Sequence, residues 1–162
     1  MKRHQLLIIL MLFIFNISSF SQRIDTLYYD NAGKGVETKE FASYIGYASY
    51  AKDANFGNRI RVYYADSNTL YMEGSFLSID KYDMTKGAYD GERRAYYKNG
   101  NMMQISNFKN GVQNGETKEY YENGQLQGEF NYKDGIFDNV NISYYQNGLI
   151  HKKSTFANGK LN

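Results

Sequence analysis

The sequence contains no cysteine, no proline and no tryptophan. The absence of cysteine excludes disulfide bonds and thiolate metal sites, so packing and strand pairing alone must hold the fold together. Proline interrupts strand ladders, and its absence suits a sheet made of many paired strands. Histidine is scarce as well, because only His4 and His151 are present. A lone strand histidine such as His151 is typical of an ordinary surface residue.

The short motifs of common catalytic and cofactor sites are also missing. There is no GxSxG, HExxH, CxxC or Walker glycine loop. Carboxylates are numerous, but nothing in their spacing indicates a pocket that would raise the pKa of one of them. Asp80, Asp83 and Asp90 suggest calcium, yet their spacing matches no EF-hand loop. We therefore predict that the chain is not an enzyme and has no catalytic site, cofactor or metal ion.

Residues 1–21 have the features of a secretory signal peptide. They combine a basic start, an apolar run over residues 6–15 and small residues near Ser21. The apolar run is too short to span a bilayer, which needs about 20 residues. We expect cleavage after Ser21, no transmembrane span afterwards, and a location that is periplasmic, associated with the outer membrane or secreted. A retained anchor is the alternative.

Loss of this segment would leave the chain neutral. The full sequence has 19 basic and 17 acidic residues. Lys2 and Arg3 leave with the signal peptide and no acidic residue does, so 17 residues of each sign remain. A nucleic-acid-binding protein would show a basic excess gathered on one face. We therefore expect no nucleic-acid partner.

A repeat of 24 residues organises the rest of the sequence. The phrases YYKNG (96–100), YYENG (120–124) and YYQNG (144–148) recur at this spacing, and Gly87, Gly111, Gly135 and Gly159 keep the same period. A fixed period with two glycine-containing turns per unit predicts β-hairpins stacked side by side. We predict an all-β fold: an open, meandering antiparallel sheet of hairpin repeats over 57–162, with a loop insertion near 78–86. A short irregular cap at 22–56 would precede it.

The Asn-Gly dipeptides predict where the hairpins turn. A type I′ turn needs positive φ at both central residues, and Asn and Gly reach this conformation most easily. A two-residue loop of this kind pairs Tyr121 with Leu126. The same spacing pairs Tyr97 with Met102 and Tyr145 with Ile150. The first tyrosine of each doublet then lies on the opposite face of the sheet.

These first tyrosines, Tyr96, Tyr120 and Tyr144, form a column of their own. In a single-layer sheet, two aromatic columns on opposite faces cannot both be buried. The column is therefore a candidate stripe for binding a partner, either a glycan or an extended peptide. The alternative is that the rings only cover the sheet and pack on lysine and glutamine stems.

The units GETKEYYENGQLQGEFNYKDG and GERRAYYKNGNMMQISNFKNG resemble the MORN repeat variant, as found in bacterial proteins labelled YwqK-like antitoxins. The shared pattern is a Gly-Glu start, a doubled aromatic, Asn-Gly and a closing aromatic-x-Asn/Asp-Gly, and it covers 87–159 well and 57–86 loosely. The stretch 27–50 is also similar to the amino-terminal part of secreted Bacteroidetes proteins that carry these repeats. The resemblance implies an open antiparallel β-sheet with a binding or scaffolding role.

Together these features predict an exported, non-catalytic β-repeat module that mediates protein–protein or scaffold interactions at the cell envelope. Its partner would be another envelope protein, with a glycan as the second candidate. A carbohydrate-binding or glycan-processing envelope domain is one alternative. The antitoxin label implies a cytoplasmic partner-binding protein instead, and the signal peptide conflicts with that reading, because repeat similarity says little about the partner.

Overall fold

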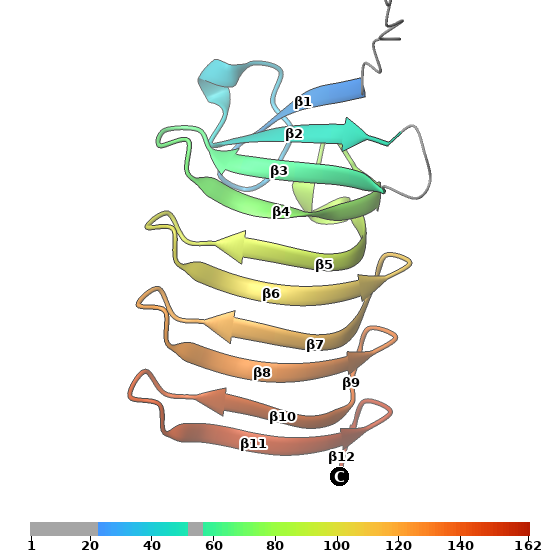
Figure 1. Ribbon diagram of the computed structural model, residues 1–162, viewed down its shortest axis with the longest axis vertical. Helices are drawn as coiled ribbons and strands as arrows, with labels where there is room; N and C mark the ends of the chain where they lie inside the picture. The colour runs from blue at the N-terminus through green and yellow to red at the C-terminus, as the bar shows by residue number, and fades with distance from the viewer. Residues whose placement is uncertain (1–22, 52–56) are drawn as a thin grey trace, which may run out of the picture.

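The chain folds into one antiparallel sheet, so the predicted all-β class is confirmed. The computed structural model describes residues 23–51 and 57–162, and the predicted signal peptide lies outside the described residues. Twelve strands form the sheet, and they follow one another in space almost in chain order (Figure 1). Because neighbouring strands are also neighbours in sequence, the sheet is a meander with no crossover connection among the described strands.

The strands are β1 (Arg23–Tyr29), β2 (Tyr44–Tyr50), β3 (Asn58–Tyr64), β4 (Leu70–Ser78), β5 (Ala88–Tyr96), β6 (Met102–Lys109), β7 (Val112–Tyr120), β8 (Leu126–Lys133), β9 (Ile136–Phe137), β10 (Asn139–Tyr144), β11 (Ile150–Ala157) and β12 (Lys160–Leu161). Two 3₁₀ turns, η1 (Lys39–Phe41) and η2 (Met84–Lys86), are the only helical segments within 23–51 and 57–162. Strands β1 and β2 lie in the stretch predicted as a cap and belong to the same sheet as the repeats.

The two turns of each unit have different geometries, and the type I′ prediction was placed on the wrong one. At Asn110–Gly111 the φ angles are +52° and +82°, so both central residues have the positive φ that a type I′ turn requires. The doublet turns differ, because in Tyr97–Asn101 only Gly100 has positive φ. The Tyr97 carbonyl accepts from Gly100 N at 2.9 Å and Tyr97 N donates to the Asn101 carbonyl at 2.8 Å. This is a three-residue loop with a glycine bulge.

The longer loop corrects the predicted register by one residue. Met102, Leu126 and Ile150 lie opposite the first tyrosine of each doublet instead of the second: the pairs are Tyr96–Met102, Tyr120–Leu126 and Tyr144–Ile150. A register shift accompanies each of these pairs. The doublets nevertheless divide between the two faces as predicted, because the strand before each turn keeps its alternation.

The hydrophobic core lies on one face of the amino-terminal half of the sheet, which we call the core face. Its buried residues come from β2 to β5: Ala48, Ile60, Val62, Met72, Phe76 and Tyr89. The segment between β4 and β5, which contains the predicted insertion, passes behind the strands in Figure 1 and packs Ile79 and Met84 against this cluster. A second layer therefore covers only part of an otherwise single sheet.

Asp83 anchors that covering segment. Its carboxylate is almost fully buried and lies 2.6 Å from Lys34 Nζ, while Thr85 donates to it from both N (3.0 Å) and Oγ1 (2.6 Å). These hydrogen bonds, with the lysine first, hold the pKa of Asp83 well below its usual range. Tyr29, which is fully buried, donates from its hydroxyl to the Asp80 carbonyl at 3.0 Å. The segment is therefore attached to the sheet by polar contacts as well as by apolar ones.

The carboxyl-terminal half of the core face has a polar centre. Ser106 and Thr117 are each 1% exposed. Gln104 and Gln113 cover them: Ser106 Oγ donates to Gln104 Oε1 at 2.9 Å, and Gln113 Nε2 donates to Thr117 Oγ1 at 2.7 Å. Beside this polar centre, the ring of Phe137 packs against Phe130, Tyr132 and Phe156, with centroids 4.9–6.1 Å apart.

A candidate interaction surface on the open face

The predicted tyrosine column lies on the face opposite the core, which we call the open face. Tyr96, Tyr120 and Tyr144 end strands β5, β7 and β10, which are second neighbours in the sheet. Because neighbouring strands are about 4.8 Å apart, successive rings are offset by about 10 Å. All three side chains are half-buried. The structure therefore brings the three predicted residues into one row.

Two of these tyrosines are held by carboxylates. Tyr96 Oη donates to Glu73 Oε1 at 3.2 Å, and Tyr144 Oη donates to Glu129 Oε2 at 3.0 Å. Burial and then Glu73 raise the pKa of Tyr96, while the hydrogen bond to Glu129 is the main cause of the raised pKa of Tyr144. Both phenols therefore stay protonated at neutral pH and act as donors. Their rings are held in place for a partner to contact.

The charges around the column are largely paired with one another. Ion pairs on the open face join Arg61 Nε to Glu73 (3.3 Å), Arg94 to Glu92 (2.6 Å), and Lys118 to both Glu116 (3.4 Å) and Glu129 (3.7 Å). Exposed pairs of this kind contribute little to stability, about 0–1 kcal/mol each. Their effect here is to balance the charge around the rings, so that the face presents aromatic and hydrogen-bonding groups more than net charge.

Sequence reasoning missed a further member of the column. Tyr63 is the first tyrosine of the upstream doublet Tyr63–Tyr64 and lies on the open face, where its ring meets Tyr47 edge-on at 5.9 Å between centroids. The doublet itself was the available signal, because it matches YYKNG in its first two positions. Tyr47 has no such signal, since it comes from a strand outside the clear repeats.

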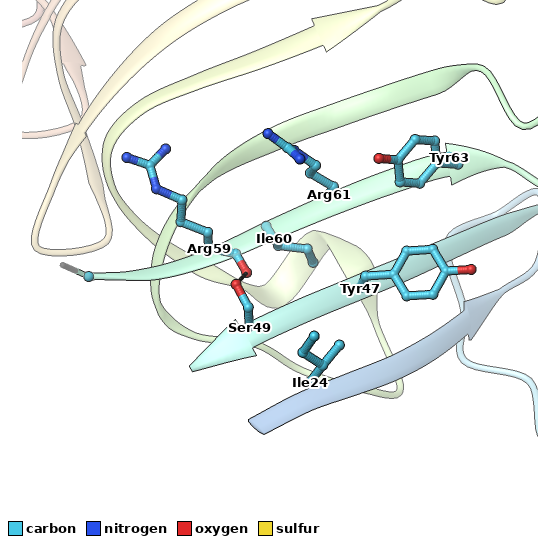
Figure 2. A pocket seen from close by; sticks show the side chains of 8 residues that line it. Ile24, Tyr47, Ser49, Arg59, Ile60, Arg61 and Tyr63 are labelled. Carbon is cyan, nitrogen blue, oxygen red and sulfur yellow. Dashed lines mark hydrogen bonds between the residues drawn. The ribbon is translucent and has the colours of Figure 1, made fainter. Parts of the chain in front are cut away.

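Tyr47 and Tyr63 line a hollow of about 490 Å³ at the amino-terminal end of this face (Figure 2). Its other polar side chains are Ser49, Arg59 and Arg61, and Ile24 adds an apolar wall. Figure 2 shows the two rings at one end and the two guanidinium groups pointing outward from β3. Ser49 Oγ donates to the Arg59 carbonyl at 3.2 Å, which fixes the hydroxyl between β2 and β3. This arrangement could hold an anionic group against an aromatic ring.

The second tyrosine of each doublet has a structural role on the core face. Each hydroxyl donates to the backbone carbonyl of the first tyrosine in the next doublet: Tyr64 to Tyr96 O (3.1 Å), Tyr97 to Tyr120 O (2.8 Å) and Tyr121 to Tyr144 O (2.7 Å). Each bond spans the strand that lies between the two doublets. In each doublet, therefore, the first tyrosine is a candidate for binding a partner and the second links its repeat to the next one. Tyr145 is the second tyrosine of the last doublet in the described sheet.

The aspartates considered as calcium ligands serve other purposes. Asp83 pairs with Lys34, Asp80 Oδ1 accepts from Tyr82 N at 2.8 Å, and Asp90 Oδ1 accepts from Asn110 N at 2.8 Å. Within 23–51 and 57–162, no three histidine or acidic side chains gather closely enough to hold a metal ion. In the same part of the chain, no helix has the length and apolar character needed to cross a membrane.

Comparison with known families bears on the repeats themselves. Two adjacent units match the MORN repeat variant. The matched residues are 89–110 and 113–134, which contain Tyr96 and Tyr120. No curated protein and no solved structure matches the chain significantly. The MORN repeats account for strands β5 to β8 and the hairpins they form, and the equivalent spacing of Tyr144 places the third doublet in the same pattern.

Proposed function

We propose that this chain is an exported, non-catalytic repeat module that binds another protein of the cell envelope through the tyrosine column of its open face. The observation that carries the proposal is the row of Tyr96, Tyr120 and Tyr144, evenly spaced on a sheet whose surrounding charges are paired. Tyrosine supplies a large contact area at low entropic cost and is enriched in protein interfaces. A partner that contacts several rings at once gains from multivalency.

The absence of catalysis is part of the proposal and has independent support. Where a pKa shift is resolved for a carboxyl group among the described residues, the pKa is lowered: Asp25, Glu40, Asp66 and Asp83. A general acid at neutral pH needs a raised pKa, as in a buried or like-charged carboxyl group. The MORN repeats favour the same reading, because repeats of this kind are generally protein-interaction modules.

Export is a separate element, supported by the signal-peptide features of residues 1–21. It places the partner in the periplasm, at the outer membrane or outside the cell. It also argues against the antitoxin-like alternative, which needs a cytoplasmic chain with an intact amino terminus. The mass and the cell fraction of the protein purified from its native host test this element directly. A chain that begins at Gln22, or a full-length chain held in the membrane, supports export, and a full-length chain in the cytoplasm contradicts it.

The tyrosine column can be tested with two triple variants. The change Tyr96→Ser/Tyr120→Ser/Tyr144→Ser removes the rings, whereas the matched change of the same residues to Phe keeps the rings and removes only the hydroxyls. We expect crosslinked capture of a specific envelope protein to fall at least about tenfold for the serine variant, a loss of about 1.4 kcal/mol, and to persist for the phenylalanine variant. Circular dichroism and thermal unfolding establish that both variants remain folded. If the folded serine variant captures the partner as well as the native chain does, the column is structural only.

The hollow of Figure 2 favours one second candidate, binding of an acidic glycan. Tyr47 and Tyr63 offer stacking surfaces for a sugar ring, and the guanidinium groups of Arg59 and Arg61 offer donors for its carboxylate or sulfate. Titration with an acidic oligosaccharide, comparing the native chain with Arg59→Ala and Tyr47→Ala, checks this candidate. Equal binding by all three chains would remove the hollow as the site.

A further inference from the structure

A hollow of about 280 Å³ on the core face contains two charged side chains that the repeats do not require. Arg93 of β5, Gln104 of β6 and Glu119 of β7 line it, and Ala95 leaves space between them because its side chain is small. Gln104 lies opposite Ala95 in one strand pair and opposite Glu119 in the next. One hollow therefore holds a guanidinium, an amide and a carboxylate.

The amide of Gln104 lies between the two charged groups and is hydrogen-bonded to both. Arg93 Nη2 donates to Gln104 Oε1 at 2.9 Å, and Gln104 Nε2 donates to Glu119 Oε1 at 3.0 Å. Because a guanidinium only donates and a carboxylate only accepts, these contacts allow one orientation of the amide. The group between the arginine and the glutamate thus accepts on one side and donates on the other.

Neither charged group has an ion-pair partner within 23–51 and 57–162. On the open face, by contrast, the adjacent residues Arg94 and Lys118 both pair with carboxylates. The Nε of Arg93 is also buried without a hydrogen-bond partner in the described part of the chain. A half-buried charge without an opposite charge is costly. The hollow can therefore accommodate one further negative and one further positive group.

The guanidinium of Arg93 is held in position before any ligand arrives. A Cβ at Gly74 would lie 3.3 Å from Cα, Cβ and Cγ of Arg93, so the glycine leaves room for the arginine stem. The guanidinium carbon lies 5.1 Å from the ring centre of Tyr89 and 5.2 Å from that of Phe108, at cation–π distance. A cation that is already ordered costs less entropy when a ligand binds to it.

The two charges depart from the repeat. The residues equivalent to Arg93 in the next two units are Thr117 and Asn141, and the residue equivalent to Glu119 in the following unit is Ser143. Those units form the same strand pairs without the charges, so the hairpin stack does not depend on them. Departures from a consistent pattern are expected at functional sites.

The remaining wall of the hollow is apolar, with contributions from Tyr71, Tyr97 and Met103. The ring of Tyr71 packs against Tyr44 and Tyr64, with centroids 4.6 and 5.3 Å apart, which fixes its position. Aromatic rings and a thioether pack well against apolar side chains. A ligand that fits the hollow therefore carries an apolar group next to its charged groups.

We propose that this hollow binds a free amino acid with an apolar or aromatic side chain. The α-carboxylate accepts from Arg93, the ammonium group donates to Glu119, and the side chain lies against Tyr71 and Tyr97. This zwitterion has the same order of acceptor and donor as the Gln104 amide, with full charges that strengthen both contacts. A carboxylate alone would be repelled by Glu119, and an amine alone by Arg93. Both charged residues lie on the face opposite the tyrosine column, so the inference does not depend on the proposed protein-binding function.

Isothermal titration calorimetry of the full chain with L-phenylalanine tests the site. N-acetyl-L-phenylalanine and L-phenylalaninamide each lack one charge and should bind at least about tenfold more weakly. Glu119→Gln keeps an acceptor for Gln104 but removes the charge. It should weaken binding of L-phenylalanine about tenfold and strengthen binding of N-acetyl-L-phenylalanine, which also shows that the variant folds. The control Glu116→Gln makes the same change on the open face and should leave both affinities within about twofold.

Two further measurements locate the ligand. In NMR spectra, L-phenylalanine should shift the side-chain N–H signals of Gln104 and Arg93. Arg93→Lys keeps the positive charge but loses the planar fork of donors. This variant should bind L-phenylalanine and its N-acetyl derivative more weakly, while its affinity for L-phenylalaninamide stays within about twofold.

Several results would overturn the proposal. One is the absence of binding at about 10 mM L-phenylalanine. Another is equal affinity for L-phenylalanine and its two derivatives, because the charges would then play no part in recognition. A folded Glu119→Gln chain that binds L-phenylalanine as the native chain does would exclude the carboxylate. Binding of glucose that shifts the Gln104 signals, without binding of L-phenylalanine, would make the hollow a sugar site instead.

Discussion

Replacement of Tyr121 by Phe isolates the contribution of one hydroxyl that links two repeats. The hydroxyl donates to the Tyr144 carbonyl at 2.7 Å and is part-buried, while the ring stays in place in the variant. Such a hydrogen bond contributes a net of about 1 kcal/mol to folding. For a chain of this length, that loss lowers Tm by about 3 °C. The same change at Tyr145, which has no following doublet in the described sheet, should cost almost nothing.

The series can be extended because the same bond recurs. Tyr64→Phe and Tyr97→Phe should each lose about as much as Tyr121→Phe. The links lie in successive repeats about 10 Å apart, so their costs should add to about 3 kcal/mol in the triple variant. Urea unfolding followed by tyrosine fluorescence and circular dichroism measures these differences. Since the bonds couple neighbouring units, the triple variant should also unfold over a broader range of urea.

Two results would refute the reasoning about these links. If Tyr145→Phe costs as much as Tyr121→Phe, the effect comes from the local environment of the ring and not from a link between repeats. If the triple variant is as stable as the native chain, water replaces the hydroxyl at each carbonyl without loss. In either case the doubled tyrosine would need another explanation.

The remaining predictions concern the covering segment and its attachment. Gly35→Ala should destabilise the fold by about 2 kcal/mol or more, because the added Cβ would lie 2.3 Å from a backbone carbonyl oxygen. At Gly87 the nearest atom to an added Cβ is a side-chain oxygen at 3.4 Å, so Gly87→Ala should be mild. Equal Tm values for the two variants would contradict this prediction. Asp83→Asn should destabilise at pH 7. Because the folded state lowers the pKa of Asp83, its ionised carboxylate stabilises the fold at pH values above its unfolded pKa of about 3.9, and this stabilisation is lost as the pH falls below that value. The difference in urea midpoint between the native chain and Asp83→Asn should therefore become smaller toward pH 2. A difference that stays constant with pH would exclude the ionised carboxylate as its cause. Burial raises the pKa of Tyr29 to about 12, so the stability it contributes below its unfolded value of about 10 should be lost between pH 10 and 12, and Tyr29→Phe should flatten that alkaline decline in Tm.

The sequence was sufficient to predict the all-β class and the stacking of hairpins in chain order, because a repeat of 24 residues indicates both. The spacing of the doublets and glycines defines stacked hairpins, whatever the details of each turn. The same spacing predicts that Tyr96, Tyr120 and Tyr144 lie on one face, because they occupy equivalent positions of the repeat and successive side chains of a strand alternate between the two faces. Nothing further was needed to predict an open antiparallel sheet.

The sequence alone could not predict the register of the strands, because Asn-Gly is compatible both with a two-residue type I′ turn and with a three-residue loop that has a glycine bulge. At Asn110–Gly111 both residues take positive φ, whereas at Asn99–Gly100 only the glycine does. In the second case the Asn99 side chain accepts from Asn101 N at 2.9 Å, a local contact that favours the longer loop. Propensity alone does not separate these outcomes, and one residue of loop length moves every cross-strand pair near the turn.

The hollow beside Tyr47 could not be predicted for a different reason. It depends on β1, β2 and β3 lying side by side, and β1 and β2 show no repeat from which to place their residues. Tyr63 carried the signal of a doublet, but its neighbours in space come from 24–49. Sites built from unlike segments need the tertiary arrangement, whereas sites built from repeats do not.

Because each doublet has one tyrosine on the open face and one that links to the next repeat, the length of the sheet and the number of rings on the open face increase together with each repeat. Each unit of 24 residues adds two strands, hence about 10 Å of length, and brings its own ring for the surface and its own hydroxyl for attachment to the next unit. Duplication or loss of a whole unit would therefore change the length over which a partner is contacted without disturbing the chemistry of any contact. In such a protein, the gain or loss of whole repeats can change the length of the contact surface in fixed steps while the fold stays the same.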